Sequence, residues 1–105
     1  MKAIIDGKRY DTEKAILIGE DTSGGGRSHF GWWEEGLYRT KQSGIYFLAG
    51  EGGPRSHYAE NLGQGSWGRG SKITPLSEKE AQTWAERHLA PHEVEAAFGA
   101  TIEDA

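Results

Sequence analysis

Residues 76–99 read LSEKEAQTWAERHLAPHEVEAAFG, and this stretch predicts two consecutive helices. Ser77 and Glu80 have the spacing of a capping box, in which each side chain bonds the backbone N–H of the other residue, so Ser77 is the expected N-cap. Pro91 ends the first helix and can open a second at its first turn, and Gly99 fits a C′ residue that stops the second helix. The first helix has one apolar stripe at helical spacing, formed by Ala81, Trp84, Ala85, His88 and Leu89.

Upstream of the helices, residues 32–41 and 45–50 predict a central β-hairpin, with Gly44 in the left-handed position of the turn. The strand over 45–50 is apolar on both faces, which places it in the middle of a sheet. Gly36 suggests a β-bulge in the first strand of this hairpin.

The first 31 residues predict two further β-segments and a loop. Asp6-Gly7 separates short β-prone runs and is the preferred pair for a type I′ hairpin turn. Residues 15–18 (AILI) predict another strand that ends at Gly19, with a single helical turn as the alternative. Residues 20–31 contain three consecutive glycines and are expected to form a loop.

Strands followed by helices predict an α+β domain, in which a small antiparallel β-sheet of about 4–5 strands is covered by one or two C-terminal helices. Residues 50–72 are rich in glycine, and we expect an ordered loop held in place by Tyr58 and Trp67. The 105 residues suffice for a single domain. Its expected parts are the sheet and glycine-rich loops in 1–75, a helical segment in 76–99 and a tail in 100–105.

The acidity of the chain lies in its C-terminal part. The formal net charge is −4, yet residues 1–75 contain ten basic and nine acidic residues, while residues 76–105 contain two and seven. The chain therefore lacks the basic stripe that is typical of a nucleic-acid-binding domain. With no cysteine, no long apolar run and no signal-peptide pattern, we expect a soluble cytoplasmic protein.

Three patterns resemble functional motifs but lack the context that such motifs need. Residues 63–68 match GxGxxG, but no helix follows at once to hold a pyrophosphate. His88 and His92 are four residues apart, but Pro91 breaks the helix that would align them. Adjacent Glu34 and Glu35 point to opposite faces of a strand. We therefore expect no catalytic residues, no metal and no cofactor.

The aromatic residues are more informative than these motifs. Trp32 and Trp33 are neighbours in an expected strand, so at most one indole can face the core. Tyr58 and Trp67 lie in the glycine-rich segment, close in sequence to arginines. Trp, Tyr and Arg dominate binding hot spots, which indicates a binding surface, although a thin core also recruits aromatic rings.

Four strings together suggest a relationship: DGKRYDTE from Asp6, LYRTK from Leu37, YFLAGEGG from Tyr46, and ITPLSEKEA from Ile73. Over residues 1–89 the pattern resembles a group of short proteins from bacterial phages, plasmids and conjugative elements. The resemblance brings no catalytic motif with it. It implies a context in which small acidic proteins often inhibit bacterial defence systems, including anti-CRISPR proteins that bind a host complex stoichiometrically.

We therefore expect a non-enzymatic protein-binding module of a phage or mobile element, most concretely an inhibitor of a CRISPR effector complex. Its partner would be a host protein or ribonucleoprotein complex rather than a membrane or free nucleic acid. The residues expected to contact the partner are Trp32, Trp33, Glu35, Arg55, Tyr58, Trp67 and Arg69, with Glu86, Glu93 and Glu95 as electrostatic contacts.

The alternative hypothesis is a small single-stranded nucleic-acid or DNA-regulatory binding protein. Such a protein would stack bases on Trp33 and Tyr46, aided by the cations of Arg39, Lys41 and Lys72.

Overall fold

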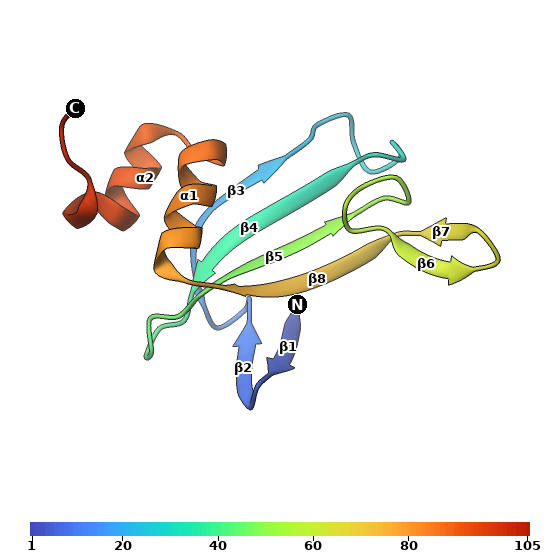
Figure 1. Cartoon of the computed structure of the whole chain (residues 1–105), viewed down its shortest axis with the longest axis horizontal. Coiled ribbons are helices and arrows are strands. Elements are labelled where there is room, and N and C mark those ends of the chain that lie inside the picture. The colour runs from blue at the N-terminus through green and yellow to red at the C-terminus, as the bar shows by residue number, and fades with distance from the viewer.

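The computed structural model describes all 105 residues, which form eight strands, two helices and one 3-10 turn (Figure 1). No helix is both long enough and apolar enough to cross a membrane. In chain order the elements are β1 (Lys2–Ile5), β2 (Lys8–Asp11), β3 (Ile16–Thr22), β4 (Trp33–Arg39), β5 (Tyr46–Gly52), β6 (Glu60–Gly63), β7 (Ser66–Gly68), β8 (Gly70–Leu76), α1 (Glu78–His88), α2 (Pro91–Phe98) and η1 (Gly99–Thr101).

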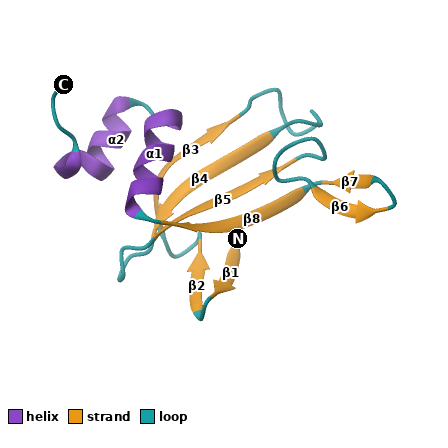
Figure 2. Ribbon diagram, viewed as in Figure 1, coloured by secondary structure: helices purple, strands orange, loops and turns teal.

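An antiparallel sheet in the order β3-β4-β5-β8 forms the middle layer of the molecule (Figure 2). The two helices cover one face of this sheet, and the β1–β2 hairpin packs against the other. The expected α+β architecture is therefore confirmed. The core under the helices consists of Leu37, Tyr46, Ala81, Ala85, Val94 and Phe98. The core under the hairpin consists of Tyr10, Phe47, Ala49 and Ile73.

The central position of β5 follows from its sequence. Tyr46 belongs to the core under the helices, and the next residue, Phe47, is fully buried in the core under the hairpin. A strand with apolar residues on both faces leaves the least apolar surface exposed to water when it lies inside a sheet that is covered on both faces. The prediction of a central strand over 45–50 is therefore confirmed. The turn before β5 also agrees, since Gly44 has a φ of 65°.

The local signals at the first hairpin and the first helix are confirmed as well. Asp6 and Gly7 have φ values of 50° and 75°, as a type I′ turn requires. At the start of α1, the Ser77 hydroxyl accepts a hydrogen bond from the Glu80 N–H at 3.1 Å, and the Glu80 carboxylate accepts one from the Ser77 N–H at 2.9 Å. Pro91 is the first residue of α2, also as predicted.

Two predictions for the early strands are wrong. β3 does not end at Gly19 but continues to Thr22, and Gly19 serves packing, because a β-carbon there would clash with the Leu89 side chain. The β-bulge lies at Ile18 in β3, where the register with β4 shifts, and not at Gly36. Gly36 instead leaves room for the ring of Tyr38 on the same face.

Two predictions for the second half of the chain also need correction. Residues 50–72 are largely strand rather than loop, because β5 extends to Gly52, β6 and β7 form a second hairpin, and β8 begins at Gly70. Within this region Trp67 is 55% exposed, so its ring does not hold the segment down. Gly99 is not a left-handed stop, since its φ is −52° and the chain continues through η1.

Candidate functional site

The end of the sheet opposite the helices gathers most of the residues expected to bind a partner (Figure 1). We call the β6–β7 hairpin, residues 60–68, the finger, and call the finger together with loops 23–32 and 53–59 the finger end. The two loops are joined by their backbones. The Gly53 N–H donates to the Trp32 carbonyl at 2.7 Å, and the Arg55 N–H donates to the Phe30 carbonyl at 2.8 Å.

Loop 53–59 is anchored to the sheet by the carboxylate of Glu35, which is only 7% exposed. The Tyr58 hydroxyl donates to one carboxylate oxygen at 2.5 Å, and His57 Nε2 lies 3.1 Å from the same oxygen. The Trp84 indole N–H of α1 donates to the other oxygen at 3.0 Å. A single carboxylate therefore connects the loop, the sheet and a helix.

The electrostatics of this anchor follow from burial and hydrogen bonding. Burial raises the pKa of Glu35, but the hydrogen bonds from Tyr58, His57 and Trp84 outweigh it, so the pKa lies below its ordinary value. Burial and the adjacent Glu35 carboxylate raise the pKa of Tyr58, so its hydroxyl stays protonated and donates. The carboxylate remains charged because all three neighbours stabilise its ionised form.

Glycines beneath loop 53–59 allow it to lie directly on the sheet. A β-carbon at Gly50 would overlap the Tyr58 ring, and one at Gly52 would overlap the Ser56 side chain. Gly70 of β8 is the register partner of Gly52, and a β-carbon there would overlap the Tyr58 carbonyl. Three glycines from two neighbouring strands thus form one shallow floor for the loop.

A second acid–histidine pair lies beside the Glu35 anchor. His88 Nδ1 is 2.9 Å from the Asp21 carboxylate, and Asp21 is the register partner of Glu35. The ring of Trp33 meets His57 and His88 edge-on, with centroids 5.8 and 6.0 Å apart. Trp33 is therefore half-buried against two histidine rings and belongs to neither apolar core.

Arginine side chains at the finger end lie over aromatic rings. The Trp32 ring is 3% exposed and has the guanidinium of Arg27 at 5.1 Å and that of Arg69 at 5.7 Å from its centroid. Arg55 lies 5.7 Å from the ring centroid of Phe30, which is 60% exposed. Arg27 also pairs with Glu34 and Glu51, whereas Arg55 and Arg69 have no carboxylate within ion-pair distance. These two arginines keep their charge available to a partner.

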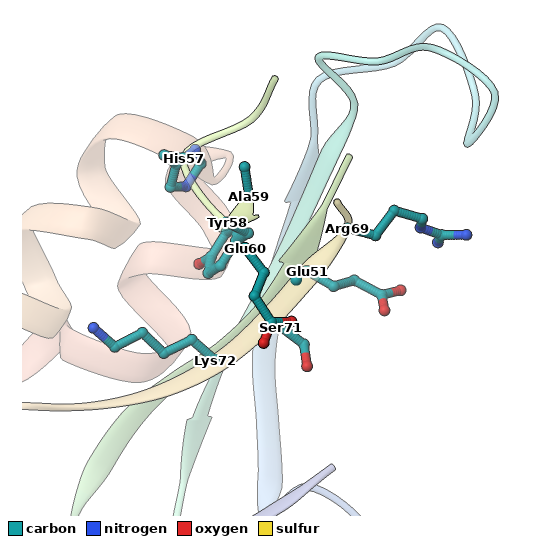
Figure 3. A pocket seen from close by; sticks show the side chains of 9 residues that line it. Glu51, His57, Tyr58, Ala59, Glu60, Arg69, Ser71 and Lys72 are labelled. Atoms are coloured by element: carbon teal, nitrogen blue, oxygen red, sulfur yellow. The ribbon is translucent and has the colours of Figure 1, made fainter. Parts of the chain in front are cut away.

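A cavity of about 630 Å³ opens between loop 53–59 and β8 (Figure 3). Lys72 of β8 and Arg69, which immediately precedes this strand, extend in opposite directions, and the carboxylates of Glu51 and Glu60 lie between them. The cavity thus carries both signs of charge without one dominant sign. It suits polar contacts with a mixed surface better than it suits a polyanion.

The structure separates the residues that the sequence analysis grouped. Glu35 and Tyr58 meet in the anchor, and Trp33 lies beside it against the ring of His57. Arg69 lies over buried Trp32, whose ring offers no surface to a partner. Trp67 lies on the finger. The three helix glutamates Glu86, Glu93 and Glu95 lie on α1 and α2, away from the finger (Figure 1). Tyr46, needed for base stacking in the alternative hypothesis, is 9% exposed and packs on Phe98.

Sequence reasoning missed four residues of the candidate site. His57 and Trp84 complete the Glu35 anchor, and Phe30 and Leu62 add exposed apolar surface, with exposed fractions of 60% and 63% for the latter two. Strand alternation offered one signal for the anchor. Glu35 lies two residues before the core residue Leu37 and so shares its face, and a carboxylate on a buried face needs hydrogen-bond donors such as those of His57 and Trp84.

The comparisons with known proteins add no assignment. No family model, no curated protein and no solved structure matches this chain.

Proposed function

We propose that the chain is a non-enzymatic protein-binding module whose finger end contacts the partner. The observation that carries this proposal is the exposure of two large apolar side chains on the finger. Leu62 is 63% exposed and lies against Gly68, while Trp67 is 55% exposed on the opposite face of the same hairpin. Neither face of the finger is covered by the rest of the chain.

A two-stranded hairpin without a covered face is only marginally stable by itself in water. The finger nevertheless carries a tryptophan and a leucine where polar residues would cost less. Burial of these side chains by a partner would contribute about 1.5–3 kcal/mol each, which gives the exposed residues a purpose that packing within the chain does not. Nearby Arg55 and Arg69 supply the other residue type that is enriched in hot spots.

We further propose that the partner is a bacterial defence complex, with a CRISPR effector as the first candidate to test. Support comes from the resemblance of residues 1–89 to short proteins of phages and mobile elements. The fold adds a physical reason for tight binding. The Glu35 anchor, with all three of its donors in place, holds the loops beside the finger in one arrangement, which lowers the entropy cost of association.

The test uses the tagged full chain to capture complexes from a host lysate that contains a CRISPR effector, with and without nuclease. We expect the effector to be retained after nuclease by the wild type and lost by the Leu62→Ser/Trp67→Ala variant. Ile4→Ala is the matched control, because Ile4 is 69% exposed on the β1–β2 hairpin, away from the finger. Thermal unfolding of all three proteins should be the same, since neither site belongs to a core.

Two results would contradict the proposal. Equal capture by the finger variant and the wild type would exclude the finger as the contact. Capture that disappears for every protein after nuclease treatment would indicate a nucleic-acid ligand in place of a protein partner.

A further inference from the structure

A second surface with ligand-binding character lies at the helical end, far from the finger. An open groove of about 300 Å³ runs between α1 and α2. Its lining combines apolar side chains with two carboxylates, and consists of Glu86, Leu89, Pro91, Val94, Glu95 and Ile102.

The C-terminal segment completes this groove. The Thr101 hydroxyl lies 2.9 Å from the Phe98 carbonyl and 2.9 Å from the Gln82 side-chain oxygen, which ties η1 to both helices. This attachment brings Ile102 to the groove, where its side chain is 39% exposed. The hydrogen bonds of Thr101 thus hold a partly exposed apolar residue at the groove.

The two carboxylates of the groove are available to a cation. Glu86 accepts a hydrogen bond only from the Gln82 amide, at 3.1 Å, and neither Glu86 nor Glu95 has a basic partner within the chain. Glu93 differs, because its carboxylate accepts the Ala90 N–H at 3.0 Å and caps α2. Residues 76–105 carry seven acidic and two basic residues, so the surrounding field also favours a positive ligand.

We propose that this groove binds a lysine or arginine side chain of the protein partner. The methylene stem of such a side chain contacts Leu89, Val94 and Ile102, and its charged group contacts Glu86 and Glu95. This inference rests on the proposed function, because it states which surface of the partner faces the helices. A basic surface is what a nucleic-acid-handling complex presents, so the two ends of the molecule would contact one partner in different ways.

The probe for this site is a fluorescein-labelled peptide of alternating leucine and arginine residues, titrated with the full chain and followed by fluorescence anisotropy. We expect Glu86→Gln/Glu95→Gln to weaken its binding about five- to tenfold, as the loss of two exposed charge contacts predicts. Glu13→Gln/Glu20→Gln is the matched control, because it changes the net charge equally at exposed positions outside both the groove and the finger end. The control should bind like the wild type.

The apolar part of the proposal has its own variant and its own peptide. Ile102→Ser should weaken the leucine–arginine peptide, and a serine–arginine peptide should bind the wild type more weakly. The proposal is overturned if the control variant loses as much affinity as the groove variant, or if a leucine–glutamate peptide binds equally. It is also overturned if the peptide does not bind, or if size exclusion shows a dimer that Ile102→Ser dissociates.

Failure here is separable from failure of the proposed function. The Leu62→Ser/Trp67→Ala variant should bind the peptide like the wild type while losing the captured complex. A groove that does not bind the peptide, together with an intact finger-dependent capture, would reject only the groove.

Discussion

Burial raises the pKa of the Glu35 carboxyl group, and hydrogen bonding lowers it. Three donors stabilise the ionised form strongly enough to lower the pKa below its ordinary value of 4.5 despite burial. A lowered folded-state pKa means that ionised Glu35 stabilises the fold above the unfolded-state pKa. That contribution is lost as the pH falls through the folded-state value.

Replacement of Glu35 by glutamine should therefore change both the stability and its dependence on pH. At pH 7 we expect Glu35→Gln to lower the free energy of unfolding by about 1–3 kcal/mol, since an amide leaves a buried donor unsatisfied. As the pH is lowered from neutral into the acid range below 4.5, the wild type should lose more stability than the variant, because only the wild type must protonate this group. Urea unfolding across this pH range, followed by tryptophan fluorescence, measures both effects.

Glu34→Gln is the control for this measurement. Glu34 is the chain neighbour of Glu35 on the opposite face, where it pairs only with Arg27 at 3.4 Å. Its removal should change the stability by less than about 1 kcal/mol, as is usual for an exposed ion pair. An equal loss of stability in Glu35→Gln and Glu34→Gln would show that the buried carboxylate contributes no more to stability than the exposed one.

At the scale of elements, the observed conformation of Gly99 reverses the expected effect of an alanine substitution on stability. A glycine in the left-handed C′ position would be destabilised by alanine, because alanine disfavours a positive φ. Gly99 has a φ of −52°, and a β-carbon added there would have no neighbour within 4 Å. We therefore expect Gly99→Ala to stabilise the protein by about 0.4–1 kcal/mol through the unfolded state.

Thermal unfolding of Gly99→Ala beside the wild type tests this expectation. Gly44→Ala is the comparison, because Gly44 also has open space around it but has a φ of 65°. This comparison variant should be destabilised. A lower midpoint for Gly99→Ala would argue against the continuous turn from α2 into η1.

Elements with a local chemical signal were predictable from the sequence, and those that depend on distant contacts were not. The capping box of Ser77 and Glu80 and the Asp6-Gly7 turn each involve neighbouring residues, so their structures follow from short-range chemistry. The end of β3 was misjudged at Gly19, because this glycine accommodates Leu89, seventy residues further along the chain. Glycine in the sequence signals either a turn or a close contact, and only the fold decides between them.

The same limit explains why the sequence predicted the candidate site only in part. Trp67 and Tyr58 were both expected in one ordered loop, but Tyr58 is held by Glu35 while Trp67 is exposed on the finger. Composition gives the same expectation for both rings, since aromatic side chains serve cores and interfaces alike. The partner of Tyr58 lies twenty-three residues away, on a strand whose register no local pattern fixes.

At the scale of the whole molecule, the sheet depends on cover from both sides. Four of the six residues of the core under the helices, Ala81, Ala85, Val94 and Phe98, come from α1 and α2. Without them, Leu37 and Tyr46 would face water. We therefore expect a chain that ends at residue 75 to lose its cooperative thermal transition and its native near-UV circular dichroism.

A chain that ends at Thr101 is the control, because it keeps both helices and η1 and removes only four residues. This shorter deletion should retain the cooperative transition. A cooperative transition in the 1–75 chain would show instead that the β1–β2 hairpin alone provides enough cover for the sheet.

The glycine floor beneath loop 53–59 has a consequence for the gene. Every base change that replaces a glycine by another residue adds at least a β-carbon, and at Gly50, Gly52 and Gly70 that atom would overlap the loop. These three codons can therefore drift only in their silent third base while the loop keeps its place. The exposed finger residues Leu62 and Trp67 are free of this restriction, so the side chains offered to a partner can diversify over generations while the loop that lies beside them stays fixed.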